Sequence, residues 1–311
     1  ITLSRSTLTR YVQQAITLVT PIYDAQWQHI LQSKVLAMDE TPIKAGRSGK
    51  GKLRQTWYWP IYGEDDEICF TWSTSRGSEH VKQQLGDFGG TLLSDGYAAY
   101  DAYAKGRPQV TQAQCWAHLR RYFERAQASD HTAAEALAII GELYRVEREI
   151  GERELTGQAK LDYRSQHALP IVEAFFTWCH TQRQRMDLVN SEPLAKALVY
   201  ADNHQAQLKV YLGDPDVPID TNHLERALRV IPMGRKNWLF NWTEVGAQQV
   251  GIIQSLLTTC RLHDVDPYAY LVDVLQRIAL HPARDVEQLT PRQWKKYFVD
   301  NPLRSDLQYA D

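Results

Sequence analysis

The chain has 311 residues, 43% hydrophobic and 23% charged, which is enough for one large soluble domain or two smaller ones. Its formal net charge of −2 excludes a globally basic nucleic-acid binder, so any nucleic-acid partner must be held by local basic patches. The four cysteines form no Cys-x-x-Cys pair and no apolar run reaches membrane-spanning length, which favours a cytosolic protein with reduced thiols and no membrane partner.

The N-terminal region is predicted to be helical. The sequence starts at Ile1 rather than Met, which indicates a fragment or a processed product. Residues 6–33 show apolar side chains near helical spacing, with Ser6 available as a cap. Pro21 is expected to break or kink this helix.

Two short apolar runs each end in an aspartate. Residues 35–38 precede Asp39, and residues 91–94 precede Asp95. Each run can form one central strand, and open α/β sheets carry their chemistry at the carboxyl ends of strands. If the two strands are parallel neighbours, the carboxylates face each other, and a divalent cation between them would relieve their repulsion. Each aspartate could equally be a turn residue, since Asp-Gly is a common turn dipeptide.

A basic segment separates the first of these strands from the next elements. Residues 44–54 hold five basic residues, three glycines and no acidic residue, which predicts a flexible loop that is mobile without DNA and contacts phosphates when DNA is bound. The candidate contacts are Lys44, Arg47, Lys50 and Lys52. Residues 56–62 and 67–73 follow, and their aromatic and β-branched content predicts an antiparallel hairpin.

Helical patterns dominate the second half of the chain. A short helix begins at Ser78, a helix covers 97–103 and a strand covers 109–113. From about 115 to 215 no strand pattern occurs, which predicts an all-helical insertion outside the sheet with helices at 116–128, 133–149, 161–185 and 193–212. Further helices are expected at 222–230, 245–262, 266–280 and 291–299.

This order of elements is typical of an α/β, ribonuclease-H-like fold. The mixed sheet would carry a helical insertion before the last catalytic helix, and a helical tail would follow at the C-terminus. The expected division is an N-terminal helical segment, the first part of the core, the insertion, the last part of the core and the tail, at 1–33, 34–114, 115–217, 218–265 and 266–311.

Six stretches are highly specific in combination: MDETP (38–42), SDGYAAY (94–100), CWAHLRRYF (115–123), NHLERALR (222–229), GRKNWLF (234–240) and SLLTTCRLHDVDPYAYL (255–271). Through them, residues 35–125 and 219–275 resemble the transposases of the insertion sequence 66 family, part of the Asp-Asp-Glu superfamily. Members usually carry a leucine-zipper-like segment and a zinc-binding region before the catalytic domain, and this chain starts after those.

The resemblance implies a chemistry and a set of partners. Asp39, Asp95 and Glu225 would be the catalytic triad, holding two Mg²⁺ or Mn²⁺ ions. Two such ions activate the attacking group and stabilise charge on the phosphate. The reaction would cleave transposon 3′ ends and join them to target DNA. The partners would be double-stranded DNA, as transposon ends and as target, and further copies of the chain assembled on it. The location would be the prokaryotic cytoplasm, at the nucleoid.

Two questions, the identity of the third carboxylate and a possible zinc site, stay open at this stage. Asp220 and Glu244 compete with Glu225 for the third acidic position. Glu225 is favoured because it lies beside the expected buried stripe of its helix, whose members are Leu224, Ala227, Leu228 and Ile231. Cys115 and His118 share a helix face, but a zinc site needs two more ligands.

Several basic and aromatic side chains are further candidates for DNA contact. His118 with Arg120 and Arg121 follows the second aspartate, and Arg229 shares a helix face with Glu225. Beyond the Glu225 helix, Arg235 and Lys236 could grip phosphate, and Trp238 could stack on an unpaired base or simply belong to the core. Two alternatives to a transposase remain: a nuclease of the same fold without strand joining, and an inactive DNA-binding remnant.

Overall fold

The computed structural model describes residues 3–305, and within them the chain divides into two compact units. The first unit comprises the described residues up to Phe88 and from Leu224 onward, and the second comprises Gly89–His223. The strands pair both antiparallel and parallel, and many helices accompany them, so the chain is a mixed α/β protein. The ribonuclease-H-like arrangement and the five-segment division remain predictions. None of the described helices is long and apolar enough to cross a membrane.

The first unit is built on one long strand that pairs with three others. β3 runs antiparallel to each of them. Ile61 of β3 pairs with both β1 and β4, and Tyr58 of β3 pairs with both β2 and β4. Since a strand has two edges, β1 and β2 lie along one edge of β3 and β4 lies along the other. The four strands are β1 (Val35–Met38), β2 (Thr41–Gly49), β3 (Lys52–Tyr62) and β4 (Ile68–Ser73).

The strand edge formed by β1 and β2 is interrupted at Asp39 and Glu40. Both strands follow one continuous register along β3, in which Asp39 falls opposite Pro60. Phe70 of β4 pairs with Pro60, yet its N–H donates to Ser255 and so points away from β3. In such an antiparallel pair the backbone nitrogen of Pro60 points away from β4 in turn, toward Asp39 on the other edge of β3. Because proline has no N–H to donate, the ladder opens at this point.

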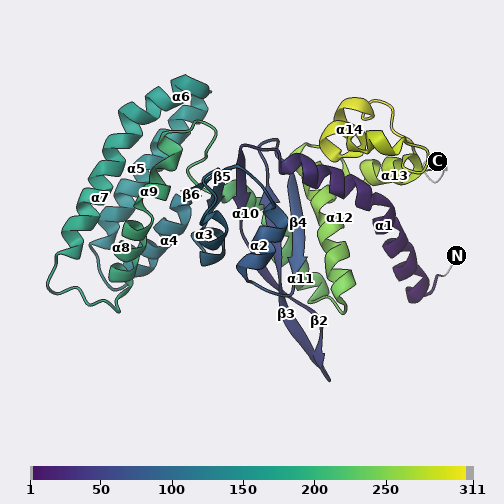
Figure 1. Cartoon of the computed structure of the whole chain (residues 1–311), viewed down its shortest axis with the longest axis horizontal. Helices are drawn as coiled ribbons and strands as arrows, with labels where there is room; N and C mark the ends of the chain where they lie inside the picture. Colours follow the sequence, from purple (N-terminus) through teal and green to yellow (C-terminus); the bar gives the residue numbers. More distant parts are fainter. Residues whose placement is uncertain (1–2, 306–311) are drawn as a thin grey trace. The chain divides into compact units, whose positions relative to one another are not determined.

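The basic segment 44–54 is a β-hairpin, so the prediction of an irregular loop is wrong, while its mobility without DNA stays a prediction. β2 and β3 pair almost to the turn, which is the two-residue loop of Lys50 and Gly51 (Figure 1). Gly51 has φ +72° and Gly46 has φ +67°, so the left-handed turn and bulge positions are both glycine. The buried side chains of Ile43 and Ala45 alternate with exposed neighbours and hold the hairpin against the core.

Helices surround these strands within the first unit, namely α1 (Arg5–Ile30), α2 (Ser78–Leu85), α11 (Val230–Trp238), α12 (Glu244–Leu262), α13 (Pro267–Arg277), η3 (Ala283–Leu289) and α14 (Pro291–Tyr297). α1 continues through Pro21, so the expected break is absent. Val19 and Ile22 on either side of the proline are buried in one cluster with residues of α12 and α13, and this packing holds the helix together. α11 was not expected from the sequence.

α12 approaches β4 closely enough to satisfy its free edge. The Ser255 hydroxyl accepts from the Phe70 N–H at 2.8 Å and donates to the Gly251 carbonyl at 2.7 Å. The Thr259 hydroxyl accepts from the Ile68 N–H at 3.3 Å. An open strand edge would otherwise leave these backbone groups unpaired, so the helix closes the sheet on this side.

We expect Gly251→Ala to destabilise the protein, by about 1–3 kcal/mol as for other overpacked cores. A Cβ at this position would lie 2.6 Å from the Phe70 carbonyl oxygen, which belongs to the backbone and cannot swing away. Gly141→Ala in the middle of a helix is the matched control, because a Cβ there meets no atom within 4 Å, and it should be neutral or stabilising by roughly 0.5–1 kcal/mol. Urea unfolding measures both, and equal effects would contradict the close approach.

The second unit combines a parallel strand pair with a group of helices. β5 (Gly90–Ser94) and β6 (Val110–Gln114) are joined through α3 (Ala98–Ala104). All the assigned elements after them in this unit are helical, as predicted for residues 115–215. They are α4 (Trp116–Ala126), α5 (Ala133–Glu152), α6 (Gly157–Tyr163), η1 (Arg164–Ala168), α7 (Leu169–Arg183), α8 (Pro193–Asn203), α9 (Gln205–Lys209) and η2 (Val210–Leu212), and the longer ones pack side by side (Figure 1).

One expected long helix of this unit is interrupted by a π-helical turn at Arg164–Ala168. The fully buried Arg164 guanidinium pairs with Glu147 of α5 at 2.8 Å and donates to the carbonyls of Tyr211 and Asp214. A buried charge needs such partners to offset its lost hydration. Arg164 therefore ties α5 and the π turn to the end of the insertion.

Candidate active site

Asp39 lies at the point where the β1–β2 edge opens. It directly follows the four buried residues of β1, and its Oδ1 accepts from the Glu40 N–H at 2.7 Å. Side chains alternate along a strand, so Asp39 continues the face of Ala37. Ala37 is buried in one cluster with residues of the helix that carries Glu225.

That helix is α10 (Asn222–Leu228), and its predicted buried stripe is confirmed. Leu224, Ala227, Leu228 and Ile231 are all buried, in the same cluster as Ala37. Glu225 is half-buried beside this stripe. The helix that carries Glu225 thus shares a core cluster with the face of β1 that Asp39 continues.

The two competing carboxylates have structural roles that the sequence had left open. Asp220 accepts from the Asn222 N–H at 2.9 Å and from its side-chain amide at 2.6 Å, so it forms the Asx turn that leads into α10. Glu244 stands in the first turn of α12, after the Thr243 cap, where an acidic side chain suits the helix dipole. It also pairs with Arg54 at 3.5 Å.

Asp95 directly follows β5, and contacts within the second unit hold its turn in place. Its Oδ1 accepts from the Tyr97 N–H at 2.9 Å, and its carbonyl accepts from the Tyr200 hydroxyl of α8 at 2.6 Å. Asp95 is therefore both a residue at the end of a strand and a turn residue, so the two interpretations of the sequence are both correct. Support from the helical insertion was not foreseen, because nothing in the local sequence links residues 95 and 200.

Gly96 is needed in this turn for two independent reasons. Its φ is +78°, which favours glycine. A Cβ there would also lie 2.4 Å from Gln114 Nε2 and 2.6 Å from His204 Nε2. Gln114 is hydrogen-bonded to Tyr200, whose ring lies 4.5 Å from that of His204, so neither neighbour can move freely. Burial lowers the pKa of His204, which favours a neutral ring beside the turn.

Comparison with known proteins decides the family. Residues 1–249 match the model described as "Transposase IS66 family", and residues 255–292 match the model described as "IS66 C-terminal element". The chain belongs to the IS66 transposase family. This confirms the family resemblance found in the sequence motifs.

Curated relatives of this IS66 family member come from Sinorhizobium fredii (strain NBRC 101917 / NGR234). The uncharacterized protein y4hP is 30% identical over 95% of this chain and 57% of its own length. The uncharacterized proteins y4qI and y4jD are 30% and 28% identical over 86% and 95% of this chain, and over 52% and 60% of their own lengths. The chain thus spans less than two thirds of the relatives it matches.

Asp39 and Glu225 of this IS66 family member belong to the first unit, and Asp95 belongs to the second. Each stands at the end of a buried strand or beside a buried helix stripe, and each is half-buried. The assembly of the three into one triad stays a prediction.

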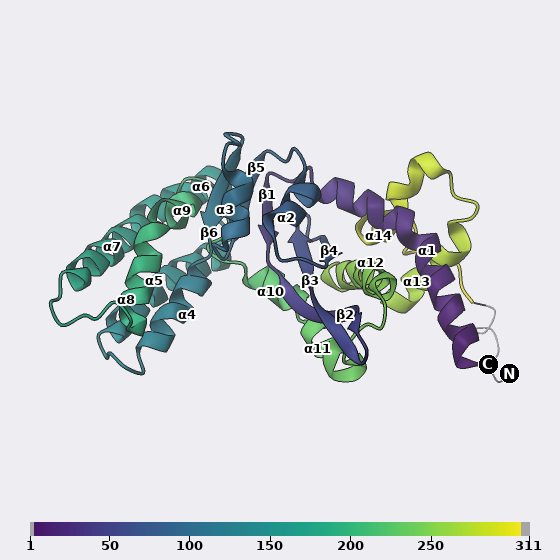
Figure 2. The same ribbon diagram turned by 60° about the horizontal axis from the view of Figure 1, so that its bottom comes forward.

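Those predicted DNA contacts that belong to the first unit fall into two groups. Lys44, Arg47, Lys50 and Lys52 are all exposed along the hairpin. α11 lies beside β2 (Figure 2). Arg229 and Lys236 around this helix are exposed, while Arg235 donates to the Pro42 carbonyl at 2.6 Å and so also braces β2. Trp238 is half-buried against the core of the first unit, which supports its packing role.

The Cys115–His118 segment of this IS66 family member offers no support for zinc. Cys115 is fully buried, and its sulfur accepts from both the N–H and the hydroxyl of Thr221 at 3.3 Å. Within residues 3–305, no group of three possible metal ligands contains Cys115 or His118. His118 lies 3.2 Å from Arg121, and Arg120 pairs with Glu124 at 2.9 Å.

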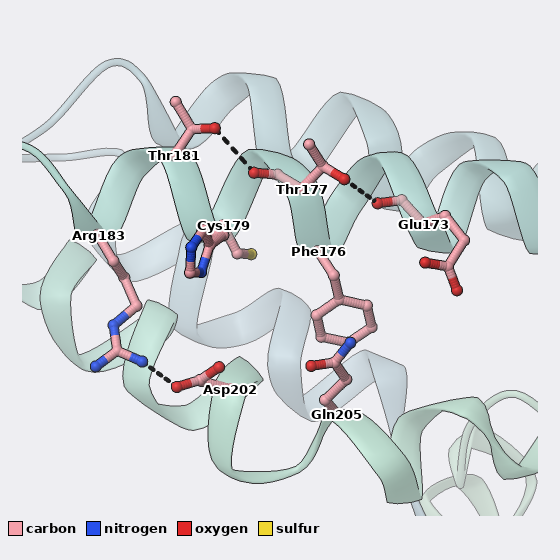
Figure 3. Close-up of a pocket in the computed structure, with 9 residues that line it drawn as sticks. Glu173, Phe176, Thr177, Cys179, Thr181, Arg183, Asp202 and Gln205 are labelled. Atoms are coloured by element: carbon pink, nitrogen blue, oxygen red, sulfur yellow. Dashed lines mark hydrogen bonds and ion pairs between the residues drawn. The ribbon is translucent and has the colours of Figure 1, made fainter.

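A hollow of about 390 Å³ between α7 and α8 is poorly suited to catalysis (Figure 3). Thr177 and Thr181 donate to carbonyls of their own helix, and Arg183 pairs with Asp202. Burial, with Asp202 nearby, raises the pKa of the Cys179 thiol to about 12, so it stays protonated. A protonated thiol is a weak nucleophile.

Proposed function

We propose that this chain is the catalytic region of a DNA transposase that cleaves transposon 3′ ends and joins them to target DNA by phosphoryl transfer. The observation that carries the proposal is the family match over residues 1–249, which includes three acidic residues placed on buried elements. The partners are the double-stranded ends and the target, and copies of the protein assemble on them at the bacterial nucleoid.

Asp39, Asp95 and Glu225 are the residues that would hold metal ions. Their donor atoms are carboxylate oxygens, which Mg²⁺ and Mn²⁺ prefer, so the residues present fit these ions. Two bound ions would supply activation of the attacking hydroxyl and stabilisation of charge on the phosphate.

The protein itself contributes orientation. A backbone N–H fixes one carboxylate oxygen of Asp39, and another fixes one of Asp95. Glu225 is anchored by the packing of Leu224 and Leu228 on the sheet. Carboxylates held this way need little rearrangement when ions and DNA arrive, and such preorganisation favours catalysis.

The test is a strand-transfer assay with the full-length protein, Mg²⁺ and a labelled duplex that carries the terminal sequence of the encoding element. Cleavage at the 3′ end, followed by a longer joined product in target DNA, is the expected result. Cleavage without any joined product would instead identify a nuclease. Absence of both products, in a protein that binds the duplex, would identify an inactive remnant.

We expect the basic hairpin to contribute phosphate contacts to DNA binding. Replacing Arg47, Lys50 and Lys52 together by Ala should weaken binding and reduce the slope of log affinity against log salt by up to about 2.7, at roughly 0.9 per lost contact. The matched control removes the same charge from the C-terminal region and should leave the slope unchanged; it replaces Arg284, Lys295 and Lys296. An unchanged slope in the hairpin variant would refute the contact.

A further inference from the structure

A hollow of about 380 Å³ lies at the tip of the β2–β3 hairpin, wholly within the first unit. One wall carries the side chains of Arg47, Lys50 and Lys52 from the hairpin. The other wall carries Phe240 and Trp242, from the segment between α11 and α12. A cationic wall facing an aromatic wall matches the two parts of a nucleotide, its phosphate and its base.

The backbone fixes the aromatic wall against the hairpin. Leu239 stands in a strained γ-turn with φ +60° and ψ −54°, in which the Phe240 N–H donates to the Trp238 carbonyl at 2.6 Å. Asn241 then pairs with β2, donating to the Lys44 carbonyl at 2.9 Å and accepting from the Gly46 N–H at 3.2 Å. Strained turns cluster at binding sites, where the surrounding structure holds them.

The aromatic side chains present an open ring face. Phe240 packs edge-on against Trp242, with ring centroids 5.0 Å apart and an angle of 84°. The edge contact orients the indole, yet Trp242 remains 66% exposed. The exposed ring face of Trp242 is therefore available for stacking with a planar ligand.

The cations of the opposite wall are available to a ligand. In residues 3–305, no ion pair involves Arg47, Lys50 or Lys52. The nearby carboxylate of Glu244 is engaged by Arg54 at 3.5 Å. The local charge of the hollow is therefore positive and suits an anion such as phosphate.

We propose that this hollow binds one unpaired nucleotide of DNA, with its base stacked on Trp242 and its phosphate held by the hairpin cations. The inference rests on the proposed function, which supplies DNA as the partner. A base inside a duplex has no free face, so stacking on Trp242 selects unpaired nucleotides such as those at an opened or cleaved DNA end. An acidic peptide would use the cations and leave the indole face unused.

The test compares two labelled DNAs by fluorescence anisotropy in EDTA: a blunt duplex, and the same duplex with a short single-stranded overhang. The wild-type protein should bind the overhang DNA more tightly. Trp242→Ala should lose about 5- to 150-fold of overhang affinity, the usual contribution of one stacked base, and keep its affinity for the blunt duplex. Trp242→Phe should retain most of the preference, because a ring remains.

The control is Tyr268→Ala, which removes another exposed aromatic ring away from the hollow and should change neither affinity. The hypothesis is overturned if the wild type shows no overhang preference, if Trp242→Ala binds overhang DNA like wild type, or if it loses affinity for both DNAs equally. Displacement of the overhang by polyglutamate as readily as by unlabelled overhang would identify an acidic-peptide site instead. No metal ion is present in this assay, so these outcomes are separate from success or failure of strand transfer.

Discussion

Glu225→Gln is expected to abolish strand cleavage in Mg²⁺ while fold and DNA binding persist. The amide keeps the size of the side chain but loses the negative charge that a divalent cation requires. Loss of a group that merely supports a metal ligand costs about 10–100-fold, so loss of a ligand itself should exceed roughly 100-fold. The rate of cleavage of a labelled terminal duplex measures the effect, and electron paramagnetic resonance of added Mn²⁺ should show fewer bound ions.

The competing carboxylates serve as matched controls. Asp220→Asn retains one oxygen that can accept from the Asn222 N–H, so the turn into α10 is kept and activity should remain substantial. Glu244→Gln loses a half-exposed ion pair with Arg54, worth less than about 1 kcal/mol, and should also remain active. If Glu225→Gln still cleaves and either control does not, the third carboxylate has been assigned wrongly.

Gly96→Ala is expected to give the next largest effect, because it disturbs the turn that carries Asp95. The positive φ costs an alanine about 1–2 kcal/mol, and the clash with Gln114 and His204 adds roughly 1–3 kcal/mol. Relief of the clash would move Gln114 or the Asp95 turn, so cleavage should fall even where the protein stays folded. Chemical denaturation and the cleavage assay together measure both effects.

Gly106→Ala separates the two causes. Gly106 has the same φ of +78°, but a Cβ there meets no atom within 4 Å. This control should show the conformational cost alone and keep wild-type cleavage. Equal losses of stability and activity in the two variants would show that Gln114 and His204 do not confine the Asp95 turn.

Features that depend on short-range patterns could be predicted from the residues alone. The buried runs before Asp39 and Asp95, the buried stripe beside Glu225 and the all-helical region after Cys115 were all correctly predicted. Their signal is a short continuous apolar run or a hydrophobic period of about 3.6 residues, and burial against any core produces it. The family motifs are equally local, which is why the IS66 transposase family could be recognised from the residues alone.

Features that depend on contacts between distant residues could not be predicted in this way. The hairpin of residues 41–62 was not predicted because its charged residues and glycines obscure the alternation of apolar and polar side chains. In the structure, Ile43 and Ala45 pack in the core and fix the hairpin in place. α1 continues through Pro21 because burial on both sides outweighs the lost hydrogen bond. The confinement of Gly96 by Gln114 and His204 joins residues up to 108 positions apart. No local pattern encodes such a contact, because the contact forms only when the helical insertion folds back onto the Asp95 turn.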